Sequence, residues 1–503
     1  MRRATRLTLC AVAAAGAALA ASAPASGASW SAAEKIPNDS SSATSQLGST
    51  NVVANIAPSG RASIVFRARG NRFWVSRRAS TTAKFVKPVE AFPKIRPVTN
   101  RFDVGMDGSN RLSVALGEST RTQDALTGIA GAIQSSKGFG PATRLSPSNG
   151  LTYGDPSVAS NPKGDVWAAF SGQSEGSAAV YVMRGSTSNG RYSGRSTLKG
   201  LAGSKHVSPP NVDIGVTNSG TVYVAFELED GSIVSYRRNT SGGWTRLPTI
   251  GQPVNGNPVD AFALDVPSSG AAVMAIAQDR DIVVRRLGTG STEWSAPETV
   301  GDDIYALASD LPVAATGQAP PNLPSQNLIQ GLDVATNSSG AVAVAWGTNP
   351  YFYSDTFTGP VQGGTGAQQL YWRSMRPSTG SPWPTPTSSA EPQWEDDPDI
   401  PFAISDVKVD MDNRRAAVAT WASSGASNGL ANPLAASTWN QTGATAWSGT
   451  QALSRFCRDS SGGIQGPSLA AYGSRGVVVA WGCSTSTPSA NDASGLLWTR
   501  SFR

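Results

Sequence analysis

Acidic and aromatic side chains gather in two segments that interrupt an otherwise regular sequence. The denser segment reads EPQWEDDPD over residues 391–399, and the other opens YFYSD at residue 351. Carboxylates paired across a sugar bond can hydrolyse it, and carboxylates beside aromatic rings also suit the binding of a sugar or of Ca²⁺. No spacing in either segment is diagnostic, so solvated acidic loops are the competing interpretation. The candidate ligand-binding residues are Tyr351, Tyr353, Asp355, Trp394, Glu395, Asp396, Asp397 and Asp399.

A second set of carboxylates recurs at one position of a repeated phrase. Aspartate opens four of the eight copies, and if the strand that it begins lines a central channel, the four side chains would form a partial cation-binding ring. The structural alternative, which we favour, is that an aspartate at the start of a strand accepts backbone N–H bonds and fixes the adjoining loop. The identity of any metal stays open. The four aspartates are Asp103, Asp213, Asp333 and Asp406.

The sequence offers little else for catalysis. His206 is the single histidine, which excludes a multi-histidine zinc site and any Ser-His-Asp or Cys-His triad in which His206 is not the base. No nucleotide-binding or EF-hand phrase stands in its required context. We therefore assign no catalytic residue and expect no cofactor, with Ca²⁺ at the acidic segments as the one exception to test.

An internal repeat must position these residues. An eight-residue phrase followed by an alternating apolar run recurs eight times, at spacings of about 50 to 74 residues, with DIGVTNSG and DVATNSSG as representative copies. Each copy predicts a strand that enters a turn whose last residue has positive φ, which glycine and asparagine tolerate. These turn residues are Gly60, Asn110, Gly164, Gly220, Gly270, Gly340, Asn413 and Gly476.

Three further strands are predicted in each repeat. The second carries a large apolar residue such as Phe66 or Trp346, the third often ends in arginine, and the fourth opens with an aromatic residue. We assign the aromatic residues Trp30, Trp244 and Trp294 to packing. Four strands per repeat are typical of a propeller blade. We predict an all-β protein with a single eight-bladed β-propeller; seven blades is the alternative, if the stretch from 101 to 148 or the last repeat is irregular.

The N-terminus contributes two features. Arginines at positions 2, 3 and 6 precede an apolar stretch and small residues, which predicts a secretory signal peptide over residues 1–28. The segment SWSAAEKI at 29–36 then matches EWSAPETV at 293–300, while the eighth repeat ends without a fourth strand. We predict that residues 29–36 form this missing strand and close the propeller domain, which spans residues 29–503.

Cysteine usage agrees with export. Removal of the signal peptide takes Cys10 and leaves Cys457 and Cys483, for which a disulfide is the default in an oxidising compartment and two free thiols the alternative. No later run reaches 18 consecutive apolar residues, so we expect a secreted or cell-surface monomer without a membrane span.

The recurring patterns DVAxNxxG, VAVAW and WSAPE resemble the secreted propeller-repeat proteins of high-GC Gram-positive bacteria, which are loosely akin to sialidase-like and other extracellular propellers. The resemblance covers essentially the whole mature chain and implies a propeller fold, but its motifs specify blades rather than chemistry. The chain lacks the Ser-x-Asp-x-Gly-x-x-Trp box of sialidases, so their catalytic residues are not carried over.

The charge of the chain indicates which classes of partner are possible. The chain has a formal net charge of +6, and eleven basic residues lie between Arg61 and Arg101 against the single acid Glu90. A solvated basic face is the common explanation, and an acidic glycan or anionic surface polymer is a reasonable partner, whereas nucleic acid is excluded for want of a reading motif. We predict an exported, non-catalytic propeller that binds a glycan, an anionic polymer or a protein, or acts as a scaffold. The alternative is a carbohydrate-active hydrolase or lyase that uses the loop carboxylates.

Overall fold

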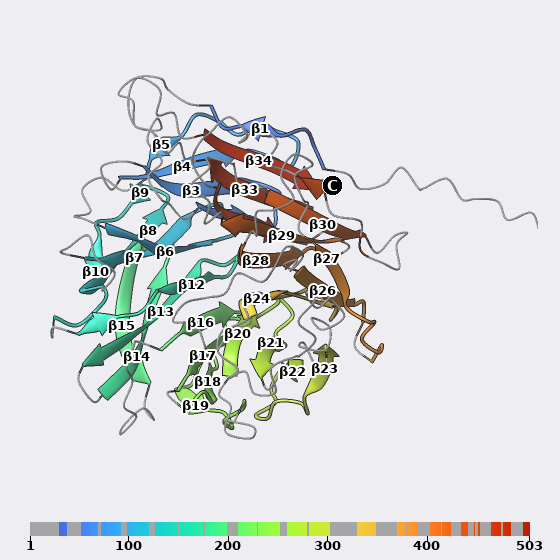
Figure 1. The fold of residues 1–503 in the computed structure, drawn as a ribbon. Helices are drawn as coiled ribbons and strands as arrows, with labels where there is room; N and C mark the ends of the chain where they lie inside the picture. Colours follow the sequence, from blue (N-terminus) through green and yellow to red (C-terminus); the bar gives the residue numbers. More distant parts are fainter. Residues whose placement is uncertain are drawn as a thin grey trace, which may run out of the picture.

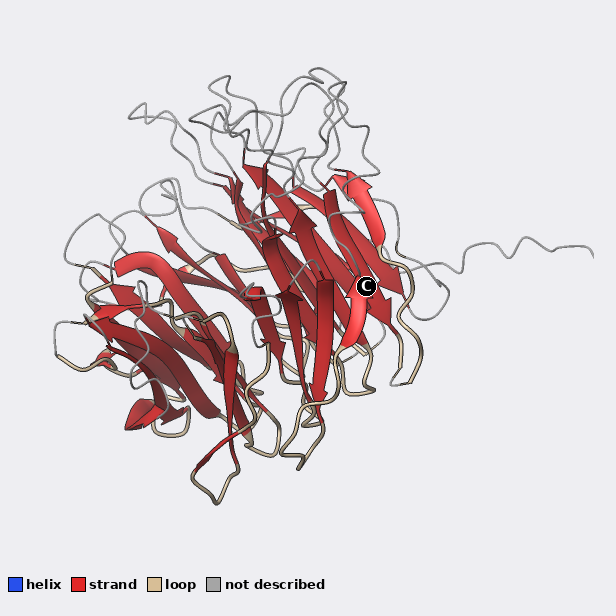
Figure 2. Ribbon diagram, turned by 60° about the horizontal axis from the view of Figure 1, so that its bottom comes forward, coloured by secondary structure: helices blue, strands red, loops and turns tan. Residues whose placement is uncertain are grey.

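The computed structural model describes the strands of every repeat and part of the connections between them. The described residues are 30–37, 52–68, 72–91, 98–119, 126–148, 151–174, 177–198, 210–228, 230–251, 259–278, 281–301, 329–348, 370–378, 380–390, 403–413, 415–423, 434–440, 447, 451–452, 464–473, 476–483 and 496–502. Every regular element among them is a strand, as Figure 2 shows.

The described strands form eight antiparallel sheets, one for each repeat phrase. The first sheet contains β2 (Val52–Ile56), β3 (Ala62–Ala68), β4 (Arg72–Arg78) and β5 (Val89–Glu90). The second contains β6 (Val98–Met106), β7 (Leu112–Glu118), β8 (Gly128–Ser135), β9 (Gly138–Phe139) and β10 (Thr143–Arg144). The third contains β11 (Thr152–Tyr153), β12 (Ser157–Ser160), β13 (Asp165–Ser174), β14 (Ser177–Ser186) and β15 (Arg191–Leu198). The fourth contains β16 (Val212–Val216), β17 (Val222–Glu227), β18 (Ile233–Arg238) and β19 (Trp244–Arg246).

The second half of the chain repeats this plan. The fifth sheet contains β20 (Val259–Asp265), β21 (Ala272–Gln278), β22 (Asp281–Leu287) and β23 (Glu298–Gly301). The sixth contains β24 (Ile329–Thr336), β25 (Val342–Thr348), β26 (Leu370–Arg376) and β27 (Thr387–Ala390). The seventh contains β28 (Ala403–Met411), β29 (Arg415–Ser423), β30 (Leu434–Asn440) and β31 (Gln451–Ala452). The eighth contains β32 (Ile464–Ala471), β33 (Val477–Cys483), β34 (Leu496–Phe502) and the N-terminal strand β1 (Glu34–Lys35).

The sheets are arranged as the blades of a β-propeller. Their first strands lie toward the centre of the molecule, as β16, β20, β24 and β28 do in Figure 1, and β10, β15, β19 and β23 lie at the periphery. First strands of neighbouring sheets contact one another, for example β20 with β24 and β24 with β28. The predicted all-β propeller is confirmed.

The turns between the first and second strands follow the predicted pattern at seven of the eight positions; Asn413 does not have positive φ, so the prediction is wrong there. Asn110 has φ 64°, and it is the one residue other than glycine with positive φ in the described part of the chain. Glycine supplies six of the other predicted turn residues, with φ from 81° at Gly60 to 102° at Gly270. A side chain at these positions would be strained, so the repeat restricts them to glycine and asparagine.

The N-terminal strand β1 pairs with β34, the last strand of the eighth sheet. Glu34 is opposite Thr499 and Lys35 is opposite Trp498 in the antiparallel pair of β1 and β34, which lie side by side in Figure 1. Trp30 forms a bridge with Phe502, and the centroids of their rings are 5.5 Å apart. Ile36 is buried in a cluster with residues of the first and eighth sheets, so the same segment also joins these two sheets.

The hydrophobic core is divided among the surfaces between neighbouring sheets, which we call seams. One cluster joins the third and fourth sheets, and another joins the fifth and sixth. The large residue predicted on each second strand is fully buried where its side chain is described, as at Phe170, Phe226 and Trp481. Each sheet therefore buries its two faces against its neighbours rather than in one common core.

In the described part of the chain there is no helix that is long and apolar enough to cross a membrane.

Candidate functional site

Several predicted residues lie outside the described part of the chain. These are the candidate ligand-binding residues Tyr351, Tyr353, Asp355, Trp394, Glu395, Asp396, Asp397 and Asp399, the histidine His206, Cys457, and the signal peptide. The side chain of Cys483 is likewise not described, although its backbone belongs to β33. The disulfide and the loop site stay predictions.

Three of the four aspartates proposed for the channel occupy equivalent positions. Asp103, Asp213 and Asp333 lie on the first strands of the second, fourth and sixth sheets, each opposite an alanine of the second strand. In the seventh sheet the side chain of Asp406 is not described, and Asp410 makes the corresponding contacts. Sequence reasoning also missed Asp265 of the fifth sheet. We call Asp103, Asp213, Asp265, Asp333 and Asp410 the central aspartates.

The central aspartates connect neighbouring sheets through the main chain. One oxygen of each carboxylate, Oδ1, accepts the N–H of the next residue, for instance that of Val334 for Asp333 at 3.0 Å. The other oxygen, Oδ2, accepts an N–H from the next sheet. These donors are Val158 for Asp103 (2.6 Å), Leu264 for Asp213 (3.1 Å), Thr336 for Asp265 (2.6 Å), Val409 for Asp333 (2.9 Å) and Ala471 for Asp410 (2.8 Å).

Burial dominates the electrostatics of this group. It raises the pKa of Asp265 to about 7, and the charges of Asp333 and Asp213 add to the rise, against the bonds from Thr336 and Val266. Burial likewise raises the pKa of Asp103 to about 6, and the nearby charge of Lys408 opposes it. The pKa values of Asp213 and Asp410 are also raised by burial. The cost of burying the charged form is offset in part by the main-chain bonds.

A cation-binding ring has no support in these contacts. The described oxygens of the central aspartates face backbone N–H groups, and the positive charge of Lys408 lies near Asp103 and Asp213. In the described ranges no group of three or more His, Cys, Asp or Glu side chains could hold a metal ion. The contacts are those of the structural alternative, in which aspartate fixes the backbone.

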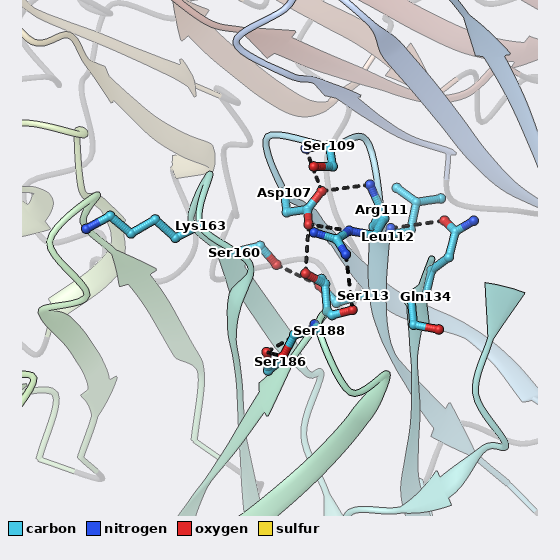
Figure 3. Close-up of polar contacts among 12 residues, drawn as sticks. Asp107, Ser109, Arg111, Leu112, Ser113, Gln134, Ser160, Lys163, Ser186 and Ser188 are labelled. Carbon is cyan, nitrogen blue, oxygen red and sulfur yellow. Dashed lines mark hydrogen bonds and ion pairs between the residues drawn. The ribbon is translucent and has the colours of Figure 1, made fainter. Parts of the chain in front are cut away.

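A second polar layer stabilises the turns. Asp107 is fully buried, and its carboxylate accepts the backbone N–H groups of Ser109 and Arg111, the Nε of Arg111 at 2.8 Å and the hydroxyl of Thr187 at 2.7 Å. Figure 3 shows Asp107 at the centre of these contacts, with Lys163 pointing away from them. Thr187 follows β14 of the third sheet, so this turn also joins two sheets.

The arginines at the ends of the third strands lie in the seams. Arg78 is 3% exposed and donates to Ser501 Oγ of the eighth sheet at 2.7 Å, and Arg286 donates to the carbonyl of Gly340 in the sixth sheet at 3.0 Å. The basic stretch of the first repeat is therefore not one solvated face. Arg77 instead bonds Gln134 of the second sheet, and Arg101 forms an ion pair with Asp155 at 3.2 Å.

The seam between the fifth and sixth sheets carries a pair of arginines that share one carboxylate. Arg376 Nη1 lies 2.7 Å from Glu298 Oε2, and Arg286 Nε lies 4.0 Å from Glu298 Oε1. The indole Nε1 of Trp383 also donates to Glu298, at 3.2 Å. Glu298 thus accepts charge-assisted bonds from the guanidinium of Arg376 and the indole of Trp383, and the more distant Arg286 interacts with it by charge alone.

The seam between the third and fourth sheets also carries two arginines, but their surroundings differ. The Cζ atoms of Arg238 and Arg184 lie 5.0 Å and 5.8 Å from the ring centroid of Trp167. Trp167 in turn makes an edge contact with Trp244, with centroids 6.0 Å apart. The acid that the structure pairs with either arginine is Asp165, at 3.9 Å from Arg184. We call Arg184, Arg238, Trp167 and Trp244 the arginine–tryptophan seam.

Part of the arginine–tryptophan seam could be predicted from the sequence. It showed that arginine ends the third strands and that Trp244 opens a fourth element, but Trp244 was assigned to packing. Trp244 does pack against the cluster between the third and fourth sheets. That Arg184 and Arg238 share one indole follows only from the contact between two sheets, so no local pattern could reveal it.

No family model and no curated protein matches the chain. Among solved structures, the BP39L lectin from Burkholderia pseudomallei is 12% identical, with 80% of this chain and 99% of that chain covered at a TM-score of 0.46. The WD40 domain of SCAP from fission yeast is 10% identical, with coverage of 93% and 97% at a TM-score of 0.47. The six-bladed fucose-recognising lectin of Aleuria aurantia is 10% identical, with coverage of 68% and 96% at a TM-score of 0.37. Similarity at this level assigns no role to any residue of this chain.

Proposed function

We propose that this protein is an exported, non-catalytic β-propeller that binds carbohydrate. The observation that carries the proposal is the arginine–tryptophan seam, where two cations and two indoles converge from adjacent sheets. Sugars are bound by directed donors beside aromatic surfaces, and guanidinium groups supply several such donors in a fixed plane.

The exposure of this seam distinguishes it from the other polar clusters. The side chain of Arg184 is 53% exposed, whereas the central aspartates are half-buried and bonded to the main chain. Trp244 is partly exposed beside it. A ligand in solution can therefore reach Arg184 and the partly exposed Arg238 and Trp244 without opening the contacts that join the sheets, whereas Trp167 is buried beneath them.

The proposal includes the scaffold and the route of export. The eight sheets are the blades of one ring, and residues 30–36 of the N-terminal segment close it by joining the first and eighth sheets. Residues 1–28 are removed as a signal peptide, which leaves residues 29–503 as the mature secreted or cell-surface protein.

A glycan array tests the function. The mature protein, residues 29–503, is compared with its Arg238→Gln variant and with Arg246→Gln as the matched control, because Arg246 is an exposed arginine of β19 outside the seam. We expect binding to a restricted set of glycans that Arg238→Gln weakens at least tenfold and Arg246→Gln leaves unchanged. Absence of binding to any glycan by the folded wild-type protein contradicts the proposal.

Catalysis is tested in the same preparation. Polysaccharides that the array identifies are incubated with wild-type protein and with an Asp396→Asn, Asp397→Asn variant. Release of new reducing ends by the wild type, with loss of that release in the variant, would show the hydrolase or lyase alternative to be correct and the non-catalytic assignment wrong.

A further inference from the structure

We propose that the arginine–tryptophan seam is a binding site for an anionic sugar substituent, a carboxylate or a sulfate, held between Arg184 and Arg238. The inference rests on the proposed carbohydrate-binding function and names the chemical class of ligand. It comes from comparing this seam with the seam between the fifth and sixth sheets, where the protein supplies its own anion.

The two arginine pairs occupy the same positions in the repeat. In the fifth sheet Arg286 is opposite Val273, three residues after the turn glycine Gly270, and in the third sheet Arg184 is opposite Trp167, three residues after Gly164. The second arginines also correspond. Each is opposite a valine two residues after its own turn glycine, with Arg376 opposite Val342 and Arg238 opposite Val222.

The position of the carboxylate that the first pair shares is taken by serine in the other seam. Glu298 is opposite Val284 on the outer strand of the fifth sheet, and the residue opposite the equivalent Val182 of the third sheet is Ser196. The hydroxymethyl group of serine carries no charge and is two carbons shorter than the side chain of glutamate. The seam between the third and fourth sheets therefore has the two arginines without a carboxylate at the position that Glu298 occupies in the other seam.

The indole groups of the two seams also differ in their hydrogen bonds. Trp383 Nε1 donates to Glu298, whereas the buried Nε1 of Trp244, which opens the corresponding element of the fourth sheet, has no hydrogen-bond partner in the described part of the chain. Trp167 also replaces the much smaller Val273 inside the seam, and the arginines stack on its ring. The Arg184 side chain is 53% exposed, against 14% for Arg286.

Both seams carry two arginines and one described acid, and burial with the charge of Arg376 lowers the pKa of Arg286 to about 10, so the seams differ in how closely the acid approaches the arginines rather than in net charge. Asp165 is the one acid among the described residues that the structure pairs with these arginines, and its Oδ2 also accepts the side-chain amide of Asn161 at 2.9 Å. Arg184 and Arg238 are close enough to interact by charge, and burial together with this repulsion lowers the pKa of Arg238. A bound anion would relieve that repulsion and accept bonds from both guanidinium groups.

The seam selects against a neutral ligand for the same reason. Two planar guanidinium groups match the two oxygens of a carboxylate or the several oxygens of a sulfate, and stacking on Trp167 holds their planes in place. The sugar that carries the anion would lie toward the solvent-exposed side of Arg184, beside the partly exposed Trp244.

Calorimetric titration of the full mature protein tests the site with defined probes. D-glucuronate and galactose 6-sulfate are compared with glucose and galactose, and inorganic sulfate is titrated alone. We expect at least one of the two acidic sugars to bind at least tenfold more tightly than its neutral counterpart. The sugar that binds more tightly distinguishes the carboxylate from the sulfate as the preferred group.

Two variants locate the binding. Ser196→Glu places a carboxylate where Glu298 lies in the equivalent seam and should weaken acidic-sugar binding at least tenfold, and Arg238→Gln should do the same if Ser196→Glu fails to fold. Arg246→Gln is the control and should bind as wild type. Equal affinity for acidic and neutral sugars, or equal weakening by Arg246→Gln and Arg238→Gln, overturns the site.

The outcomes separate this inference from the proposed function. If the acidic monosaccharides bind through Arg238 and no array glycan is retained, the anion site stands and carbohydrate binding as the function is wrong. If array glycans are retained equally by wild type and Ser196→Glu, carbohydrate binding stands and the anion site is wrong.

Discussion

The centre and the outer seams of this propeller use charged residues in opposite ways. Each central aspartate is half-buried and bonded to the backbone of its own and the next sheet, as Asp333 is to Val334 and Val409. The outer arginines instead contact side chains that differ from seam to seam, such as Glu298 in one and Trp167 in another. Hydrogen bonds to the backbone depend on the shape of the fold, so they recur from one sheet to the next. Contacts between side chains change whenever one of the residues differs. The outer seams are therefore where a regular repeat can acquire a specific ligand.

Loss of the N-terminal strand should produce the largest effect. A protein that begins at Pro37 lacks the pairing of β1 with β34, the ring contact of Trp30 with Phe502 and the buried side chain of Ile36. Loss of these large side chains should lower the free energy of unfolding by roughly 5 kcal/mol or more. Thermal and chemical unfolding, with size-exclusion chromatography, measure the loss. An unchanged melting temperature and a monodisperse peak would show that the eighth and first sheets join without this strand.

Removal of one central carboxylate should be the next most damaging change. Asp333→Ala leaves the backbone N–H groups of Val334 and Val409 without their acceptor, at about 1–3 kcal/mol for each buried donor. We expect a loss of about 2–4 kcal/mol in urea unfolding. The control is Glu293→Ala, because the Glu293 side chain is exposed and should change stability by less than about 0.5 kcal/mol. Similar losses in both variants would remove the distinction between centre and surface.

Loss of the carboxylate in the seam between the fifth and sixth sheets should destabilise the protein less than loss of a central carboxylate. Glu298→Gln keeps the shape of the side chain and removes the charge that binds Arg376 and Arg286. Since Glu298 is partly exposed, solvent screens the pair, and we expect a loss of about 1–2 kcal/mol. Glu293→Gln is the matched control. A loss as large as that of Asp333→Ala would mean that the seams hold the sheets together as strongly as the centre does.

The change of stability with pH should be the smallest of these effects. Its direction should be opposite to that expected for a carboxylate in an ordinary ion pair. The pKa of Asp265 is raised to about 7 by burial, so the folded protein binds a proton more tightly than the unfolded chain does. Stability from this group is therefore gained as the pH falls from about 7 toward 4, and lost as the pH rises. We expect a lower melting temperature at pH 8 than at pH 6.

Asp265→Asn identifies the source of this dependence. The variant cannot titrate at this position, so its melting temperature should change less between pH 6 and pH 8 than that of the wild type. It should also be less stable at both values, because an amide nitrogen cannot accept the N–H of Thr336 or Val266. A wild-type melting temperature that rises from pH 6 to pH 8 would contradict the prediction.

The sequence determined the repeated unit. Seven of the eight phrases end in a glycine or asparagine with positive φ, and the buried Phe66, Phe170 and Trp346 recur at a fixed distance from this turn residue. Such local patterns are readable because backbone sterics and strand alternation act over a few residues. The match between residues 29–36 and 293–300 was also sufficient to place β1 beside β34.

Only the tertiary structure decided what the charged residues contact. Asp410 opens no copy of the phrase, yet its carboxylate accepts the N–H of Ala471 in the eighth sheet, because the packing of the two sheets brings this N–H within its reach. In the same way Arg184 and Arg238 are 54 positions apart and share the ring of Trp167 only because two sheets pack together. Contacts between sheets depend on packing across a seam, and this information is absent from the spacing of residues within one repeat.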